Sequence, residues 1–279
     1  MSTYNDLLNK YRKAFNDDVS SLRAFLFELC TEKNIDLYME KDNEADLEVI
    51  KKFEKGIKRL LNNEPLNYVL GYSYFYGYKL KVSNGCLIPR FETEELVGKI
   101  LAYYDECFAG QDVKVADIGT GSGAIAIALK KEEPHMDVIA SDISKDALAI
   151  AKENAKLNDA DVEFVEGSML DPLIEKGIKL DILVSNPPYI KNDEVLESSV
   201  KDYEPHVALF GGEDGLKFYR MIFEDAHKVL KDKALLFFEM GYDQKENLTN
   251  LARKYFKNAE IEVFKDINNK DRMLMIKIM

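Results

Sequence analysis

The 279-residue sequence lacks several features that would define a class at once. It has no tryptophan, three histidines and three cysteines, and no Cys-x-x-Cys pair. An odd, scattered set of cysteines argues against a disulfide scaffold or a zinc site, so we expect no metal. No run of about 18 apolar residues is present, and the N-terminus shows no basic region followed by an apolar stretch. These absences predict a cytoplasmic protein without membrane contact.

An excess of basic residues is also lacking. The net charge is −12, and residues 91–279 hold 24 lysines and arginines against 37 aspartates and glutamates. Tight non-specific binding of nucleic acid draws its energy from lysine and arginine at the phosphates. Stable nucleic-acid binding is therefore not expected, although a local basic patch is not excluded.

Hydrophobic spacing divides the chain into three parts. Residues 1–71 have apolar residues at helical intervals, which predicts a small helical bundle whose last helix ends at Pro65. Residues 72–90 are rich in tyrosine and predict a β-hairpin linker. Residues 91–279 alternate short apolar strands with amphipathic helices. That alternation predicts an α/β domain with a mainly parallel, Rossmann-like sheet, whose ligands bind beyond the carboxyl ends of the strands.

The first chemical motif lies where the predicted strand 113–118 turns into a helix. Glycines there let the backbone turn sharply and let a ligand approach closely. The next strand ends at Asp142, 25 residues after Asp117, where a carboxylate can accept hydrogen bonds from both hydroxyls of a ribose. The motif therefore predicts a site for an adenosine-containing cofactor. The cofactor-binding candidates in this region are Asp117, Gly119, Thr120, Gly121, Ser122, Gly123, Asp142 and Ile143.

Two cofactors are compatible with this loop. Gly119-x-Gly121-x-x-Ala124 also satisfies the dinucleotide pattern, which would make the protein a dehydrogenase. The form Asp-x-Gly-x-Gly-x-Gly instead resembles motif I of S-adenosylmethionine-dependent methyltransferases. An acidic strand end suits that cofactor, because it carries a sulfonium and an ammonium and has no phosphate. A non-catalytic protein that only binds the cofactor is a further alternative.

The second motif, Asn186-Pro187-Pro188-Tyr189, follows the predicted strand 180–185 directly. Two prolines stiffen this loop, and Asn186 is extended because it precedes a proline. The Asn186 side-chain oxygen and the Pro187 carbonyl can accept both N–H bonds of a planar nitrogen, while Tyr189 lies against its plane. Such a grip would hold the nitrogen about 3–3.5 Å from a methyl carbon. All four residues are predicted to be catalytic and substrate-binding, and Asn186 is also predicted to border the cofactor.

Five segments together resemble the HemK/PrmC family, the protein-(glutamine) methyltransferases that modify peptide chain release factors. One of them contains Ile88-Pro89-Arg90, and another is the Asn-Pro-Pro-Tyr loop. The matching segments are residues 64–71 with 75–77, 87–90 with 93–96, 117–124, 186–189 and 203–216.

The resemblance implies a class I S-adenosylmethionine-dependent methyltransferase domain behind a small N-terminal helical domain that recognises the substrate. It implies methyl transfer to the glutamine side-chain amide nitrogen in the Gly-Gly-Gln motif of bacterial release factors, with S-adenosylhomocysteine as product. It also implies that Arg90 binds substrate and that Met169 lies near the adenine. A DNA or RNA amino methyltransferase is the alternative, because Asn-Pro-Pro-Tyr alone does not separate adenine, guanine and glutamine substrates.

Overall fold

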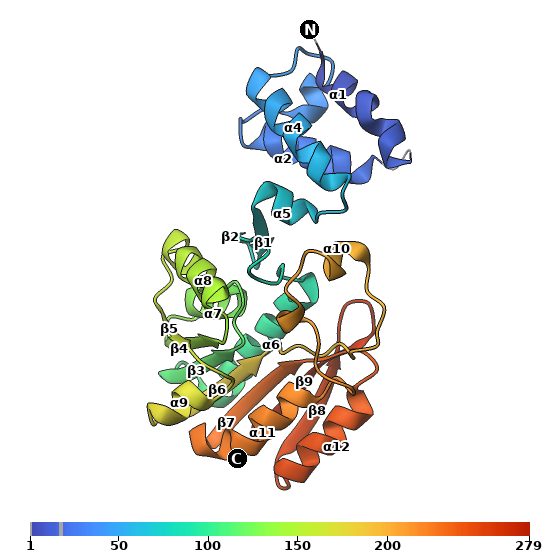
Figure 1. Cartoon of the computed structure of the whole chain (residues 1–279). Coiled ribbons are helices and arrows are strands. Elements are labelled where there is room, and N and C mark those ends of the chain that lie inside the picture. Colours follow the sequence, from blue (N-terminus) through green and yellow to red (C-terminus); the bar gives the residue numbers. More distant parts are fainter. Residues whose placement is uncertain (1, 17–18) are drawn as a thin grey trace. The chain divides into compact units, whose positions relative to one another are not determined.

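The structure is a computed structural model that describes residues 2–16 and 19–279 (Figure 1). Contacts between residues divide the chain into two units. The first comprises the described part of residues 1–71 together with 197–203, and the second comprises 72–196 and 204–279. Within the described ranges, no helix has the length and apolar character that crossing a membrane would require.

The first unit is built from short helices around its own core. Asp46 caps one of them, because its carboxylate accepts the N–H groups of Glu48 and Val49 at 2.8 and 3.1 Å. Phe25 and Phe53 stack in the core. The elements are α1 (Tyr4–Tyr11), the 3₁₀ helix η1 (Arg12–Phe15), α2 (Ser20–Thr31), α3 (Leu37–Glu40), α4 (Leu47–Leu60), α5 (Leu66–Leu70) and α10 (Ser198–Lys201).

Pro65 does not end a helix, and the prediction that it does was wrong. Helix α4 stops at Leu60, and Asn63 has a left-handed φ of +63°. Pro65 instead lies directly before α5, as its N-cap. Proline is tolerated at the start of a helix, because the N–H that it lacks would have no partner there.

The second unit begins with the hairpin that the tyrosine-rich segment predicted. Strand β1 (Tyr72–Phe75) pairs antiparallel with β2 (Tyr78–Lys81). The two residues between them, Tyr76 and Gly77, have φ values of +51° and +82°. Positive φ at both positions is what the tight two-residue turns of hairpins need.

The rest of the second unit alternates strands and helices. The strands are β3 (Val113–Ile118), β4 (Met136–Asp142), β5 (Val162–Glu166), β6 (Leu180–Ser185), β7 (Leu230–Glu239), β8 (Glu260–Lys265) and β9 (Asp271–Ile278). The helices are α6 (Phe91–Phe108), α7 (Ala124–Glu132), α8 (Lys145–Leu157), α9 (Asp171–Glu175), the 3₁₀ helix η2 (His206–Ala208), α11 (Lys217–Val229) and α12 (Lys245–Tyr255).

Seven strands form one sheet in the order β5-β4-β3-β6-β7-β9-β8. Neighbours from β5 to β7 run parallel, and β9 runs antiparallel to both β7 and β8. In β3, Val113 and Val115 pack in the cluster that includes α6 and α7. Ala116 and Ile118 point to the other face, in the cluster that includes α11 and α12 (Figure 1). Both faces are covered, and the predicted α/β Rossmann-like fold is confirmed.

Gly56 tests how tightly α4 packs in the first unit. Alanine inside a helix is normally better than glycine by about 1 kcal/mol. At Gly56, however, a Cβ would lie 2.2 Å from Cζ of Phe25, whose buried ring stacks on Phe53. Overpacking a filled core costs about 1–3 kcal/mol, and a contact this short belongs at the upper end. We therefore expect Gly56→Ala to lower the free energy of unfolding in urea by about 1–2 kcal/mol.

Gly98 in α6 provides the matched control. A Cβ there would have its nearest neighbour at 4.0 Å, the Tyr76 hydroxyl oxygen. Gly98→Ala should therefore raise the free energy of unfolding by about 0.5–1 kcal/mol. Equal effects of the two substitutions would contradict the packing argument.

Candidate active site

Three loops leave neighbouring strands at the same level of the sheet. Ile118, the last residue of β3, pairs with Ser141 of β4 on one side and with Ser185 of β6 on the other. The strand order reverses between β3 and β6, and open α/β sheets bind ligands at such a reversal. The predicted site residues that come just beyond this row are Gly119, Asp142 and Asn186.

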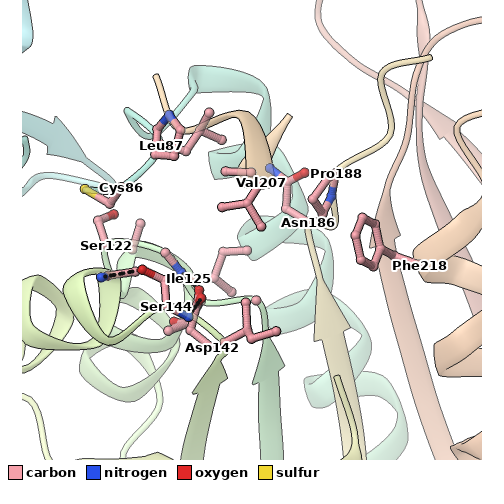
Figure 2. Close-up of a pocket in the computed structure, with 18 of the residues that line it drawn as sticks. Cys86, Leu87, Ser122, Ile125, Asp142, Ser144, Asn186, Pro188, Val207 and Phe218 are labelled. Carbon is pink, nitrogen blue, oxygen red and sulfur yellow. Dashed lines mark hydrogen bonds between the residues drawn. The ribbon is translucent and has the colours of Figure 1, made fainter. Parts of the chain in front are cut away.

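A cavity of about 320 Å³ opens at this edge of the sheet. Its size is in the range of small-molecule sites. In Figure 2, Asn186 and Pro188 lie across the cavity from Asp142 and Ser144. The predicted site residues that line it are Arg90, Gly119, Thr120, Gly121, Ser122, Asp142, Ile143, Met169, Asn186 and Pro188. Those that are not among its lining are Asp117, Gly123, Pro187 and Tyr189.

The three glycines of the loop have positive φ values, +73° at Gly119, +57° at Gly121 and +83° at Gly123. A Cβ on Gly119 or Gly121 would meet no atom within 4 Å, so open space lies beside the backbone there. At Gly123 a Cβ would lie 3.2 Å from the Cβ of Ala151. The first two glycines thus form a cradle for a ligand, whereas the third lets α7 and α8 pack closely.

Asp142 ties the end of β4 to the glycine loop. One carboxylate oxygen accepts the Gly121 N–H at 2.9 Å, and the other accepts the Ser144 N–H at 2.8 Å. Burial raises the pKa of Asp142, and these backbone hydrogen bonds oppose the shift. A carboxylate has about four acceptor sites, so both oxygens can still accept hydrogen bonds from a ligand in the cavity.

Asp117 lies beneath the loop, fully buried. Its Oδ2 accepts a hydrogen bond from the Thr120 hydroxyl at 2.6 Å, and its Oδ1 is buried without a hydrogen-bond partner. Burial raises the pKa of Asp117 to about 7, against the effect of the Thr120 hydroxyl. Asp117 therefore holds the loop in shape through Thr120, and its predicted contact with a cofactor stays a prediction.

Asn186 is anchored through the NH₂ group of its side chain. Its Nδ2 donates to Oγ1 of Thr93 at 3.2 Å, and the Thr93 hydroxyl donates to Oε2 of Glu239 at 2.6 Å. Tyr189 reaches the same carboxylate, because its hydroxyl donates to Oε1 of Glu239 at 3.2 Å. The Tyr189 ring packs with the apolar cluster under α11. Its predicted stacking on a substrate amide therefore stays a prediction.

Arg90 already has a partner within the second unit. Its guanidinium donates to Glu204 at 2.5 Å, and the Glu204 side chain is only 1% exposed. The other Glu204 oxygen accepts the Ile88 N–H at 3.4 Å. This pair joins two segments that both line the cavity, so Arg90 shapes the wall, and a direct contact with substrate stays a prediction.

Several lining residues were not predicted from the sequence. Thr93 and Val207 lie in segments that carry the family resemblance, so the sequence could have indicated that they lie near the site. Phe218 faces the cavity in Figure 2. In the sequence it is an ordinary apolar residue of α11, and no motif marks it as a site residue. Among the residues that the structure describes, no group of three or more His, Cys, Asp or Glu side chains is arranged to hold a metal ion.

Comparisons with known proteins bear on this site. Residues 8–71 match the PrmC N-terminal domain, and residues 103–202 match the Methyltransferase small domain. The release factor glutamine methyltransferase of Bacillus cereus is 43% identical over 240 residues, 85% of each chain. That of Thermodesulfovibrio yellowstonii is 39% identical over 275 residues, 96% of this chain and 97% of its own.

The chain belongs to the release factor glutamine methyltransferase family. These relatives are 43% and 39% identical over 85% and 96% of this chain, which is enough to show the family. The family membership agrees with the resemblance drawn from the five sequence segments.

Solved structures share the fold at low identity. The hMettl16 catalytic domain in complex with the MAT2A 3′UTR hairpin 6 is 16% identical, with a TM-score of 0.57, covering 86% of this chain and 95% of that domain. The 16S rRNA methyltransferase RsmC of T. thermophilus, in complex with AdoMet and guanosine, is 14% identical, with a TM-score of 0.51 and coverage of 75% and 50%. These likenesses show that this member of the family has a methyltransferase fold.

The pKa of Asp117 leads to a testable dependence on pH. Folding raises the pKa of Asp117 from its ordinary value of 3.8 to about 7. Between these two pH values the folded protein therefore keeps a proton on Asp117 that the unfolded chain has lost. The free energy of unfolding should therefore fall as pH rises from about 4 to 7, by up to about 1.4 kcal/mol per pH unit.

Asp117→Asn removes this titration and keeps an oxygen that can accept from Thr120. We expect the variant to match the wild type near pH 4 and to be more stable at pH 8, as measured by guanidinium denaturation across this range. Parallel pH profiles of the two proteins would contradict the assignment.

Proposed function

We propose that this protein transfers the methyl group of S-adenosylmethionine to the side-chain amide nitrogen of the glutamine in the Gly-Gly-Gln motif of peptide chain release factors. S-adenosylhomocysteine is the other product. The observation that carries the proposal is the single cavity shared by the glycine loop, Asp142 and Asn186. The names of relatives that are 39–44% identical support the same substrate.

The residues on one side of the cavity fit S-adenosylmethionine. Gly119 and Gly121 leave open space beside their backbone, and Asp142 has acceptor sites for the hydroxyls of a ribose. Ile143 and Met169 add apolar surface for an adenine ring. When bound, this cofactor supplies an electrophilic methyl group on a positively charged sulfur.

Asn186 and Pro187 are proposed to align the other reactant, the glutamine side-chain amide. A carboxamide nitrogen is a poor nucleophile, because its lone pair is delocalised into the carbonyl. In the proposed arrangement the Asn186 Oδ1 and the carbonyl of Pro187, of which only Asn186 lines the cavity, accept the two N–H bonds. The nitrogen is then held in place with one face towards the methyl carbon. Orientation of this kind converts an encounter between two molecules into a reaction within one assembly.

The reaction needs no strong base. Among the described residues that line the cavity, there is no histidine and no glutamate. Methylation makes the amide nitrogen acidic, so its extra proton passes to water after the C–N bond has formed. The protein therefore acts by positioning two reactants rather than by removing a proton first.

We assign recognition of the release factor to residues 1–71, the linker to 72–90 and the chemistry to 91–279. The first unit has its own core and matches the PrmC N-terminal domain over residues 8–71. A separately folded unit can add contact area for a protein substrate without altering the geometry of the chemistry.

The mass of a release factor tests the function. Purified protein, S-adenosylmethionine and a bacterial release factor should yield a factor that is heavier by one methylene, on the Gly-Gly-Gln peptide. Asn186→Ala should lower kcat by about 100-fold or more, because the nitrogen is no longer aligned, and should keep cofactor affinity within a few fold. Label from the cofactor that appears in DNA or RNA instead would support the alternative substrate class and reject this one.

Asp142 tests the cofactor side. Asp142→Ala should weaken binding of S-adenosylmethionine by about 1–3 kcal/mol in a calorimetric titration, the scale of a lost hydrogen bond to a charged group. Asp146→Ala, which removes an exposed carboxylate at the start of α8, is the control for the change in charge. Equal affinities of the two variants would show that Asp142 does not hold the cofactor.

A further inference from the structure

A chain of hydrogen bonds leads from Asn186 into the core of the second unit. The Asn186 Nδ2 donates to Thr93 Oγ1, Thr93 donates to Glu239 Oε2, and Tyr189 donates to Glu239 Oε1, at 3.2, 2.6 and 3.2 Å. Thr93 is 4% exposed and Glu239 is 2% exposed. Thr93 and Glu239 are therefore shielded from bulk water, and their side chains have few other ways to satisfy their hydrogen bonds.

The direction of this chain is set at its buried end. The Thr93 hydroxyl donates its single proton to Glu239 at 2.6 Å, a distance typical of a hydroxyl that donates to a carboxylate. The Thr93 oxygen then has only lone pairs to offer Asn186, and only the NH₂ end of the Asn186 carboxamide can meet them. The Asn186 oxygen is consequently the end that is free for the substrate.

Both oxygens of the Glu239 carboxyl have a hydroxyl donor, Thr93 at Oε2 and Tyr189 at Oε1. Burial raises the pKa of Glu239, and these two hydrogen bonds and the positive charge of Arg272 oppose the rise. The backbone carbonyl of Glu239 is also held, because it accepts the buried Tyr219 hydroxyl at 2.6 Å. The carboxylate is thus fixed on more than one side.

We infer that Thr93, oriented by Glu239, is the positioning residue that makes Asn186 present its oxygen, and not its NH₂ group, to the substrate. This inference rests on the proposed function, because it matters only if Asn186 must accept an N–H bond from the reacting nitrogen. Reversal of the carboxamide would place the Asn186 NH₂ group against the substrate N–H that the Asn186 oxygen should accept, while the Pro187 carbonyl could accept only the other N–H. Such a contact is repulsive, so an enzyme in this state binds its cofactor but does not align its substrate.

Thr93→Val tests the inference with minimal change of shape. Valine keeps the volume and removes only the hydroxyl, so the Asn186 NH₂ group loses its acceptor. We expect kcat for release-factor methylation to fall by about 10–100-fold. The dissociation constant of S-adenosylmethionine should change little, whereas the melting temperature should fall, because the buried Glu239 carboxyl loses one of its two donated hydrogen bonds. Thr93→Ser, which keeps the hydroxyl, should restore kcat to within about threefold of the wild type.

Thr249 supplies a matched control for the loss of a threonine hydroxyl. Its Oγ1 is buried without a hydrogen-bond partner, and it lies in α12, away from the residues that line the cavity. Thr249→Val is therefore expected to leave kcat unchanged. Thr93→Ala removes the same hydroxyl as Thr93→Val and adds no atoms, so it repeats the test if valine disturbs folding.

Each outcome decides the inference. An unchanged kcat in Thr93→Val and Thr93→Ala overturns it, and so does a loss in Thr93→Ser equal to that in Thr93→Val. A loss of cofactor binding in parallel with kcat assigns Thr93 a structural role and also overturns it. The reaction of the wild-type protein tests the proposed function separately. If the wild type yields no methylated release factor, the proposed function is rejected and not the role of Thr93.

Discussion

The alignment of Ser141, Ile118 and Ser185 across three parallel strands is the constraint on which the site depends. Parallel strands end on the same side of a sheet, so this one register brings the glycine loop, the acidic strand end and the Asn-Pro-Pro-Tyr loop to a single cavity. A shift of β6 by one residue would turn its alternating side chains to the opposite faces. The buried clusters on both faces of the sheet exclude such a shift.

Burial of polar groups behind the cavity has a cost that the structure offsets locally. A carboxylate as buried as Glu239 would be strongly unfavourable alone, but two hydroxyls donate to it and Arg272 lies near enough to lower its pKa. Asp117 is satisfied at one oxygen only and carries a pKa raised to about 7. Burial raises the pKa of both acids, but Glu239 has a hydroxyl donor at each oxygen whereas Asp117 has one at Oδ2 only.

The residues of the two motifs could be found from the sequence because each motif is local. Gly119 and Gly121 have positive φ values and open space beside their backbone, both of which favour glycine. Glycines at this spacing after a predicted strand can be recognised from the sequence alone. The chain of Thr93, Asn186 and Glu239 could not be found in this way. Its members come from α6, the loop after β6 and the end of β7, and Thr93 and Glu239 are 146 positions apart. No periodicity or motif relates residues at that distance.

The sequence by itself determined the α/β class, the hairpin, the glycine loop and the stiff Asn-Pro-Pro-Tyr turn, because each depends on neighbours within a few positions. Tertiary structure alone decided that Tyr189 points its hydroxyl to Glu239, that Arg90 pairs with Glu204, and that Asp117 lies under the loop instead of lining the cavity. These outcomes depend on which distant side chain is within hydrogen-bonding reach of each group, and only the packing of the strands and helices brings those partners together.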